Sequence, residues 1–191
     1  MKCDIILAGV GGQGILTIAA TIGLAAVEQN LFLKQSEVHG MSQRGGDVQS
    51  HLRLSDREIH SDLIPHGSAD LIISVEPMEA LRYLPWLSAG GWVVTNSVPK
   101  VNIPDYPDLQ DLLAELQNMV NTIVMDADSI AKELGSSRSG NMVILGAAAS
   151  FIAMPFASLE NAVQKLFMRK GDEIVDLNLA ALRAGRDAAG R

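Results

Sequence analysis

The stretch Gly9-Val10-Gly11-Gly12-Gln13-Gly14 decides the fold, because it fits the pattern G-x-G-x-x-G directly after the apolar run at residues 4–8. The run predicts a buried strand, and residues 13–29 predict a helix. In such a unit the glycines allow a tight turn, close approach of a ligand to the backbone and close packing of helix on strand. An anion such as a phosphate is expected at the helix N-terminus. The candidate cofactor-binding residues are Gly9, Gly11, Gly12, Gln13 and Gly14; a tight turn without a ligand is the alternative.

Short apolar runs alternate with helical patterns along the chain, which is typical of crossover units that build a parallel sheet. Further strands are expected at residues 31–35, 48–54, 71–75, 92–95 and 122–125. Residues 48–54 alternate apolar and polar side chains, and we expect a small antiparallel hairpin between them and residues 58–60. The fold class is therefore α/β, with a Rossmann-like, doubly wound and mostly parallel sheet, in a single domain over residues 1–191.

The helices have recognisable ends in the sequence. Pro77 begins one that Gly90-Gly91 ends, and Asp108 can cap another that reaches residue 120. Residues 99–107 hold three of the seven prolines and predict an exposed loop. The last third is expected to be helical, with Ser158 as a cap and with Gly171 ending one helix before the next. The apolar helix at residues 141–153 predicts either core packing or a subunit interface.

Composition excludes several classes of protein. The formal net charge is −7, with 15 Lys and Arg against 22 Asp and Glu, which argues against a nucleic-acid partner. Cys3 is the only cysteine, so the chain has no internal disulfide and cannot alone hold an iron–sulfur cluster, and a cytoplasmic setting is expected. Two uncharged stretches, residues 6–27 and 139–159, are interpreted as buried and not as membrane spans, because glycines and polar residues interrupt both.

A second glycine-rich loop follows the second predicted strand. We expect it to emerge at the same sheet edge as the glycine turn, because ligands bind at the carboxyl ends of strands in open α/β sheets. Residues 34–53 carry three basic and two acidic residues in an acidic chain, so this segment is the predicted local basic patch. The alternative is a solvated loop with an ion pair between Glu37 and Arg44. Its candidate binding residues are Glu37, His39, Ser42, Gln43, Arg44, Gly45 and Gly46.

Three other site types receive little support. An NAD site needs an acidic residue about 20 positions after the glycines, where Lys34 and Gln35 stand instead. This weakens the hypothesis of a free-standing nucleotide-binding or NAD(P)-dependent oxidoreductase, which is kept as the second hypothesis. Ser42, His39 and Asp47 lack the nucleophile-elbow spacing of a hydrolase triad. The four histidines lack metal-ligand spacing. We predict no catalytic residue and no metal ligand in this chain.

The glycine turn and the stretch Glu37-Val-His-Gly-Met-Ser-Gln-Arg-Gly-Gly46 together resemble the gamma subunit or domain of 2-oxoacid:ferredoxin oxidoreductases. The form of the second motif is most similar to the beta subunit of indolepyruvate ferredoxin oxidoreductase. The resemblance covers most of the chain and extends to residues 61–65, 69–72, 76–81 and 141–146.

The resemblance implies a chemistry that the chain does not carry alone. Such enzymes oxidatively decarboxylate a 2-oxoacid with coenzyme A, using thiamine diphosphate and iron–sulfur clusters and usually passing electrons to ferredoxin. The chain is expected to be an accessory subunit that binds neither thiamine diphosphate nor a cluster itself, is inactive alone and needs a catalytic partner that holds both. Indolepyruvate or another aryl pyruvate is the expected substrate. The two loops are expected to contact coenzyme A, with docking onto the partner as the alternative.

Overall fold

The computed structural model describes residues 1–40 and 45–190, except for the side chain of His39. Ser42, Gln43 and Arg44, three of the predicted binding residues, lie outside the described residues. The strands of the described part are β1 (Lys2–Val10), β2 (Phe32–His39), β3 (Asp47–Ser55), β4 (Ala69–Ser74), β5 (Leu87–Asn96) and β6 (Thr122–Met125). Its α-helices are α1 (Ile15–Glu28), α2 (Pro77–Arg82), α3 (Leu109–Asn118), α4 (Ala127–Glu133), α5 (Gly140–Ala148), α6 (Phe156–Phe167) and α7 (Asp172–Ala188).

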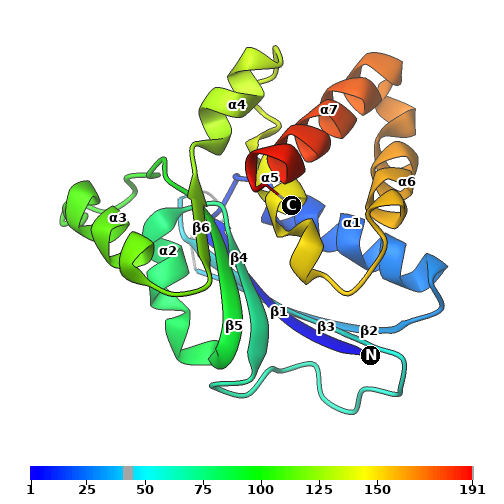
Figure 1. The fold of residues 1–191 in the computed structure, drawn as a ribbon, viewed down its shortest axis with the longest axis horizontal. Helices are drawn as coiled ribbons and strands as arrows, with labels where there is room; N and C mark the ends of the chain where they lie inside the picture. Colours follow the sequence, from blue (N-terminus) through cyan, green and yellow to red (C-terminus); the bar gives the residue numbers. More distant parts are fainter. Residues whose placement is uncertain (41–44, 191) are drawn as a thin grey trace.

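The strands form one mixed sheet in the order β2-β3-β1-β4-β5-β6 (Figure 1). β1, β4, β5 and β6 run parallel, while β3 is antiparallel to both of its neighbours, β1 and β2. β2 therefore runs in the same direction as β1, with β3 between them. The carboxyl ends of β1 and β2 consequently lie at the same edge of the sheet, and this edge carries both glycine-rich loops.

Helices cover both faces of the sheet, so the expected doubly wound α/β fold is confirmed. Alternate residues of β1 point to opposite faces, and Ile5 and Leu7 join the core under α1, α5, α6 and α7. Ile6 and Ala8 join a smaller core under α2 and α3. Figure 1 shows α2 and α3 on one side of the sheet and the C-terminal helices with α1 on the other.

The helix at residues 141–153 is core, as one of its two interpretations predicted. It is shorter than expected, and Met142 to Ala148 are all buried within α5. Gly146 of α5 meets α7 so closely that an added Cβ would lie 1.9 Å from the carbonyl oxygen of Leu182. The reciprocal contact places a Cβ on Gly185 1.9 Å from the carbonyl oxygen of Val143. Glycine at both positions lets the two helix backbones touch.

Several boundaries differ from the sequence predictions. Residues 58–60 form no strand, because β3 already pairs along its length with β1 and β2 and has no open edge for a hairpin there. Gly90-Gly91 does not end a helix but lies inside β5, where the ladder with β4 shifts register. A Cβ on Gly91 would lie 2.9 Å from the carbonyl oxygen of Ala69, so the glycine permits this irregularity.

The helix caps were predicted with mixed success. Asp108 caps α3 by accepting from the amides of Gln110 and Asp111, as predicted. Ser158 does not cap α6, since the helix begins at Phe156 and Ser158 is buried inside it. The boundary at Gly171 was correct, because α7 begins at the next residue.

Candidate functional site

The two glycine-rich loops meet directly at the carboxyl edge of the sheet. The amide of Gly11 donates to the carbonyl oxygen of Gly46 at 2.8 Å, and the amide of Gly45 donates to the carbonyl oxygen of Gly11 at 3.4 Å. This pairing continues the β1–β3 ladder, whose last pair is Val10 with Asp47. The expectation that both loops share one edge is confirmed, although β1 and β2 are not adjacent because β3 lies between them.

The backbone of the glycine turn requires glycine at two positions. Gly12 and Gly14 have φ angles of 98° and 84°, which L side chains rarely adopt. Gly14 also forms the N-cap of α1, and an added Cβ there would lie 2.5 Å from Nδ2 of Asn141. Asn141 instead donates from Nδ2 to the carbonyl oxygen of Gly14 at 3.1 Å. The start of α5 is thereby fixed against the start of α1.

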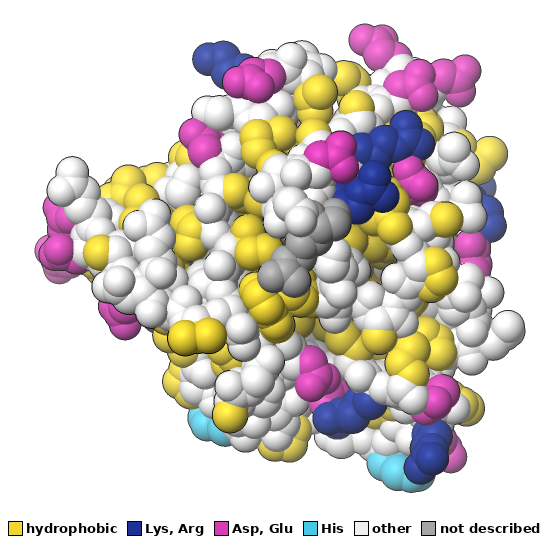
Figure 2. Space-filling view, viewed as in Figure 1, with side chains coloured by type: hydrophobic (Ala, Val, Ile, Leu, Met, Phe, Trp, Pro, Cys, Tyr) yellow, Lys and Arg dark blue, Asp and Glu magenta, His cyan; other side chains and the backbone are white. Residues whose placement is uncertain are grey.

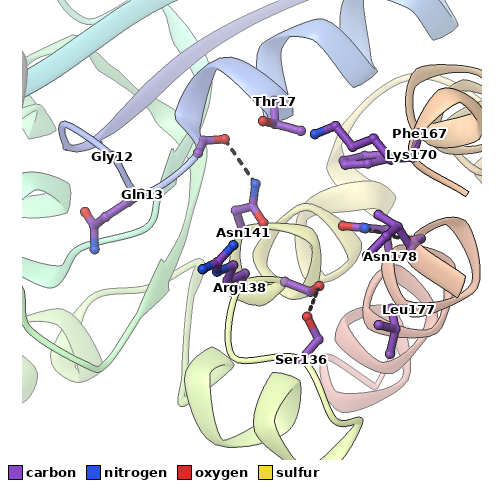
Figure 3. A pocket seen from close by; sticks show the side chains of 13 residues that line it. Gly12, Gln13, Thr17, Ser136, Arg138, Asn141, Phe167, Lys170, Leu177 and Asn178 are labelled. Carbon is purple, nitrogen blue, oxygen red and sulfur yellow. Dashed lines mark hydrogen bonds between the residues drawn. The ribbon is translucent and has the colours of Figure 1, made fainter.

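Gln13 braces the turn from the other side. Its Oε1 accepts from the amide of Val10 at 2.8 Å, and its Nε2 donates to the carbonyl oxygen of Val75 at 3.2 Å. The side chain therefore joins the ends of β1 and β4 and points away from Asn141 in Figure 3. Both ends of its amide are used within the fold, so Gln13 shapes the turn through these two bonds.

Two of the turn amides are available to a ligand. The amide of Gly11 is engaged by Gly46, and that of Gln13 donates to the carbonyl oxygen of Val10 at 3.1 Å. Among the residues that the structure describes, no acceptor takes the amides of Gly12 and Gly14. Gly14 is the N-cap of the 14-residue helix α1 and Gly12 lies two residues before it, so these donors suit an anion at the start of the helix.

Two pockets open beside the turn and share Gly12, Gln13, Arg138 and Asn141 in their walls. One, of about 340 Å³, lies between the turn and the α6–α7 junction, where Phe167 and Lys170 line it (Figure 3). The other, of about 400 Å³, lies toward the end of β5 and is lined by Lys100 and Asp128. Among the residues that the structure describes, Arg138 is the cation that lines both pockets.

The cations at this edge were missed by the sequence reasoning. Lys100, Arg138 and Lys170 are exposed and come from segments that are distant in sequence: two loops and the short 3-10 helix Met168–Lys170. The available signal was the polar stretch at residues 135–141, directly before an apolar helix. Its proximity to the glycine turn depends on how α5 packs, and no local pattern shows that.

Part of the predicted basic patch lies elsewhere. Lys34 pairs with Arg53 in the β2–β3 ladder, and β2 continues five residues beyond Lys34 to His39, so Lys34 is not at the strand's end. Arg53 makes a bidentate ion pair with buried Asp4, at 2.8 and 3.1 Å. Asp4 precedes Val10 by six strand residues, which places this pair about 20 Å from the carboxyl edge. Among the described residues of 34–53, neither cation faces the glycine turn.

The base of the second loop is held by α2 and its neighbourhood. Asp47 receives a hydrogen bond from the hydroxyl of Tyr83 at 3.3 Å, and its carbonyl oxygen accepts from the amide of Gly40 at 3.1 Å. Burial and the nearby carboxylates raise the pKa of the Tyr83 phenol well above its ordinary value. Tyr83 therefore stays protonated and donates. Glu37 is half-buried in β2, within 3.5 Å of Nε2 of Gln35.

The chain's own residues do not fit an iron–sulfur cluster. Cys3 is its one cysteine and lies buried in β1, where its Sγ donates to the carbonyl oxygen of Phe151 at 3.7 Å. Burial raises the pKa of this thiol to about 11, so it is not a thiolate ligand at neutral pH. Among the described residues no cluster of His, Cys, Asp and Glu could hold a metal ion, and no helix is long and apolar enough to cross a bilayer.

Known proteins similar to this chain include subunits of one enzyme group. It is 37% identical to indolepyruvate oxidoreductase subunit IorB of Archaeoglobus fulgidus over 198 residues, covering 99% of this chain and 96% of that protein. The corresponding subunit of Methanothermobacter thermautotrophicus is also 37% identical, over 99% of this chain and 98% of its own length. The 2-oxoglutarate synthase subunit KorC of Methanothermobacter marburgensis is 27% identical, over 98% and 96%.

Solved structures share the fold. A keto/oxoacid ferredoxin oxidoreductase gamma subunit from Geobacter sulfurreducens has a TM-score of 0.72 at 24% identity, covering 98% of both chains. The 2-oxoglutarate:ferredoxin oxidoreductase of Magnetococcus marinus, solved with 2-oxoglutarate, coenzyme A and succinyl-CoA bound, has a TM-score of 0.76 at 21% identity. The match covers 99% of this chain and 31% of that much longer one.

The solved structures share the architecture of this chain. The family model of pyruvate ferredoxin/flavodoxin oxidoreductases matches residues 4–188, nearly the whole chain. The sequence resemblance is thus confirmed, and the chain is homologous to the IorB and KorC subunits. It belongs to the pyruvate ferredoxin/flavodoxin oxidoreductase family.

Proposed function

We propose that the chain is the gamma-type accessory subunit of an indolepyruvate-type 2-oxoacid:ferredoxin oxidoreductase. The observation that carries the proposal is end-to-end similarity to IorB subunits at 37% identity. The KorC subunit is less similar, at 27% identity, and supports the same subunit role. Its name refers to another 2-oxoacid, 2-oxoglutarate. The substrate is accordingly an aryl pyruvate, with indolepyruvate first.

The chemistry belongs to a partner subunit in this proposal. Thiamine diphosphate supplies stabilisation of the acyl carbanion, and iron–sulfur clusters carry the two electrons to ferredoxin. This chain has a single buried cysteine and so requires the clusters to be elsewhere. The isolated chain is expected to be inactive, and the complex to work in the cytoplasm.

The chain's contribution is to bind coenzyme A and present it to that partner. We assign the phosphates to the free amides of Gly12 and Gly14 and to Arg138, which lines both adjoining pockets. Lys100 and Lys170 add positive charge to the two pocket walls. Arg44 is expected to contribute a further charge-assisted bond, with His39, Ser42 and Gln43 secondary. The fit is electrostatic, because these cations give the pocket walls local positive charge in a chain whose net charge is −7.

The test is reconstitution with a thiamine-dependent partner subunit that is purified together with this chain. Coenzyme A-dependent reduction of a viologen dye is measured with indolepyruvate, pyruvate and 2-oxoglutarate. Activity that needs both chains and favours indolepyruvate supports the proposal. Full activity of the partner alone would refute the subunit role, and a preference for 2-oxoglutarate would refute the substrate assignment.

A further inference from the structure

Residues 97–108, which we call the strap, connect β5 to α3 and cross the edge of the sheet that carries the two glycine-rich loops. The sequence predicted this segment only as an exposed proline-rich loop. Its ends are held by β5 and by the Asp108 cap of α3. Two interior contacts hold its middle: one to the buried end of β4 and one to the second glycine-rich loop.

The first contact anchors the strap on Glu76, whose side chain is fully buried directly after β4. One carboxylate oxygen caps α2 by accepting from the amide of Glu79 at 2.8 Å. The other accepts from the hydroxyl of Tyr106 and from the amide of Lys100 at 3.3 Å. Since a buried carboxylate needs donors, two of which come from the strap, the strap and α2 are fixed by one group.

The second contact reaches the loop itself. Nδ2 of Asn102 donates to the carbonyl oxygen of Gly45 at 2.8 Å. The amide of Gly45 in turn donates to the carbonyl oxygen of Gly11, and the amide of Gly11 donates to the carbonyl oxygen of Gly46. Among the described residues, the other amide atom of Asn102, Oδ1, is buried without a partner. Burying an unpaired polar atom is costly, and the bond that Asn102 donates to Gly45 offsets part of this cost.

We propose that the strap positions Gly45 and Gly46, the described end of the second glycine-rich loop, against the glycine turn, and that Asn102 is the positioning residue. A path of contacts joins Glu76 to the glycine turn. It runs through the hydrogen bond of Glu76 with Tyr106, along the backbone of the strap to Asn102, and through the hydrogen bonds of Gly45 to Gly11. The proposal rests on the proposed function, because the two glycine-rich segments that are positioned in this way belong to the proposed coenzyme A site. Asn102 acts through Gly45 and contacts no substrate.

The test uses Asn102→Ala and, as a second variant of the same path, Tyr106→Phe, which keeps the ring and removes its bond to Glu76. Asn161→Ala is the matched control, since Asn161 is exposed on α6. Amide hydrogen exchange of Gly11 and Gly45 is measured on the full chain. KM for coenzyme A and kcat are measured on the reconstituted complex with indolepyruvate.

Both strap variants are expected to speed exchange at these two amides and to raise KM for coenzyme A about three- to tenfold, with kcat unchanged. Their double variant should show less than the sum of the two effects, because both lie on one path. The control should match the unmodified chain in both measurements.

Unchanged exchange in both variants would overturn the proposal, as would faster exchange with an unaltered KM. A lower kcat at constant KM would also overturn it, since that places Asn102 in the chemical step. If the unmodified complex shows no dependence on coenzyme A, the proposed function has failed; the exchange measurement then still decides whether the strap fixes the loop.

Discussion

The buried side chain of His51 links the long connection at residues 56–68 to the sheet. His51 of β3 is buried, accepts from the amide of Ile64 on Nδ1 at 3.0 Å, and packs edge-on against Trp86. Burial lowers the pKa of this imidazole below its ordinary value, so the ring is neutral in the folded chain. Protonation would remove the lone pair that receives the Ile64 amide.

A pH dependence of stability follows from His51. The unfolded chain binds a proton here as the pH falls through about 6.5, whereas the folded chain does not until lower pH. Stability should therefore fall with pH below about 6.5, and His51→Gln should flatten this part of the profile. The measurement is Tm between pH 8 and pH 5.5. His60→Gln, at an exposed histidine of the same connection, is the control and should leave the profile unaltered.

At the scale of elements, the crossing of α5 and α7 depends on two glycines. Gly146→Ala would drive its Cβ into the backbone of Leu182, so backbone must shift. We expect a loss of about 3 kcal/mol in the free energy of unfolding, as for an overpacked core. Urea denaturation measures it. Gly90→Ala is the control because a Cβ there meets nothing within 4 Å, and an equal loss in both variants would contradict the close-crossing account.

Local patterns predicted the elements wherever local chemistry fixes them. Asp108 was a correct cap because the cap bond spans only two or three residues. β2 was placed correctly, but its predicted end was too early, since three of its last four residues are polar and the strand continues there through its pairing with β3. Gly90-Gly91 was misread because its role, a close approach to β4, is a tertiary contact.

The candidate site divides in the same way. Gly12 and Gly14 could be found because a turn between strand and helix imposes their spacing. Arg138 and Lys100 could not, since packing of α5 and the course of the strap bring them to the turn. Lys34 and Arg53 were grouped by sequence proximity alone, and the β2–β3 register places them along the strands and away from the loops.

At the scale of the whole molecule, acidic and basic side chains are distributed unevenly over the surface. Figure 2 shows acidic side chains at the α3 end of the molecule and at other places on this face, and residues 101–121 hold four acids and no Lys or Arg. The cations of the pocket walls lie at the carboxyl edge instead. An anion approaching this acidic chain therefore meets local positive charge beside the glycine turn.

Cys3 reports on opening of the whole molecule. Its thiol is buried beneath the C-terminal helices, and its pKa is raised to about 11, so two barriers oppose its reaction. A thiol reagent at pH 8 should label the native chain at least about a thousandfold more slowly than the chain in urea. Rapid labelling of the native chain would mean that the start of β1 opens without global unfolding.

Under the proposed function, this chain supplies the coenzyme A site of a multi-subunit oxidoreductase. The most direct test is isothermal titration of the assembled complex with coenzyme A, comparing the unmodified chain with Arg138→Ala and with Arg57→Ala, an exposed arginine in the connection after β3. We predict that Arg138→Ala raises Kd about tenfold or more, while Arg57→Ala leaves it unaltered. Equal affinity in all three complexes would contradict the account.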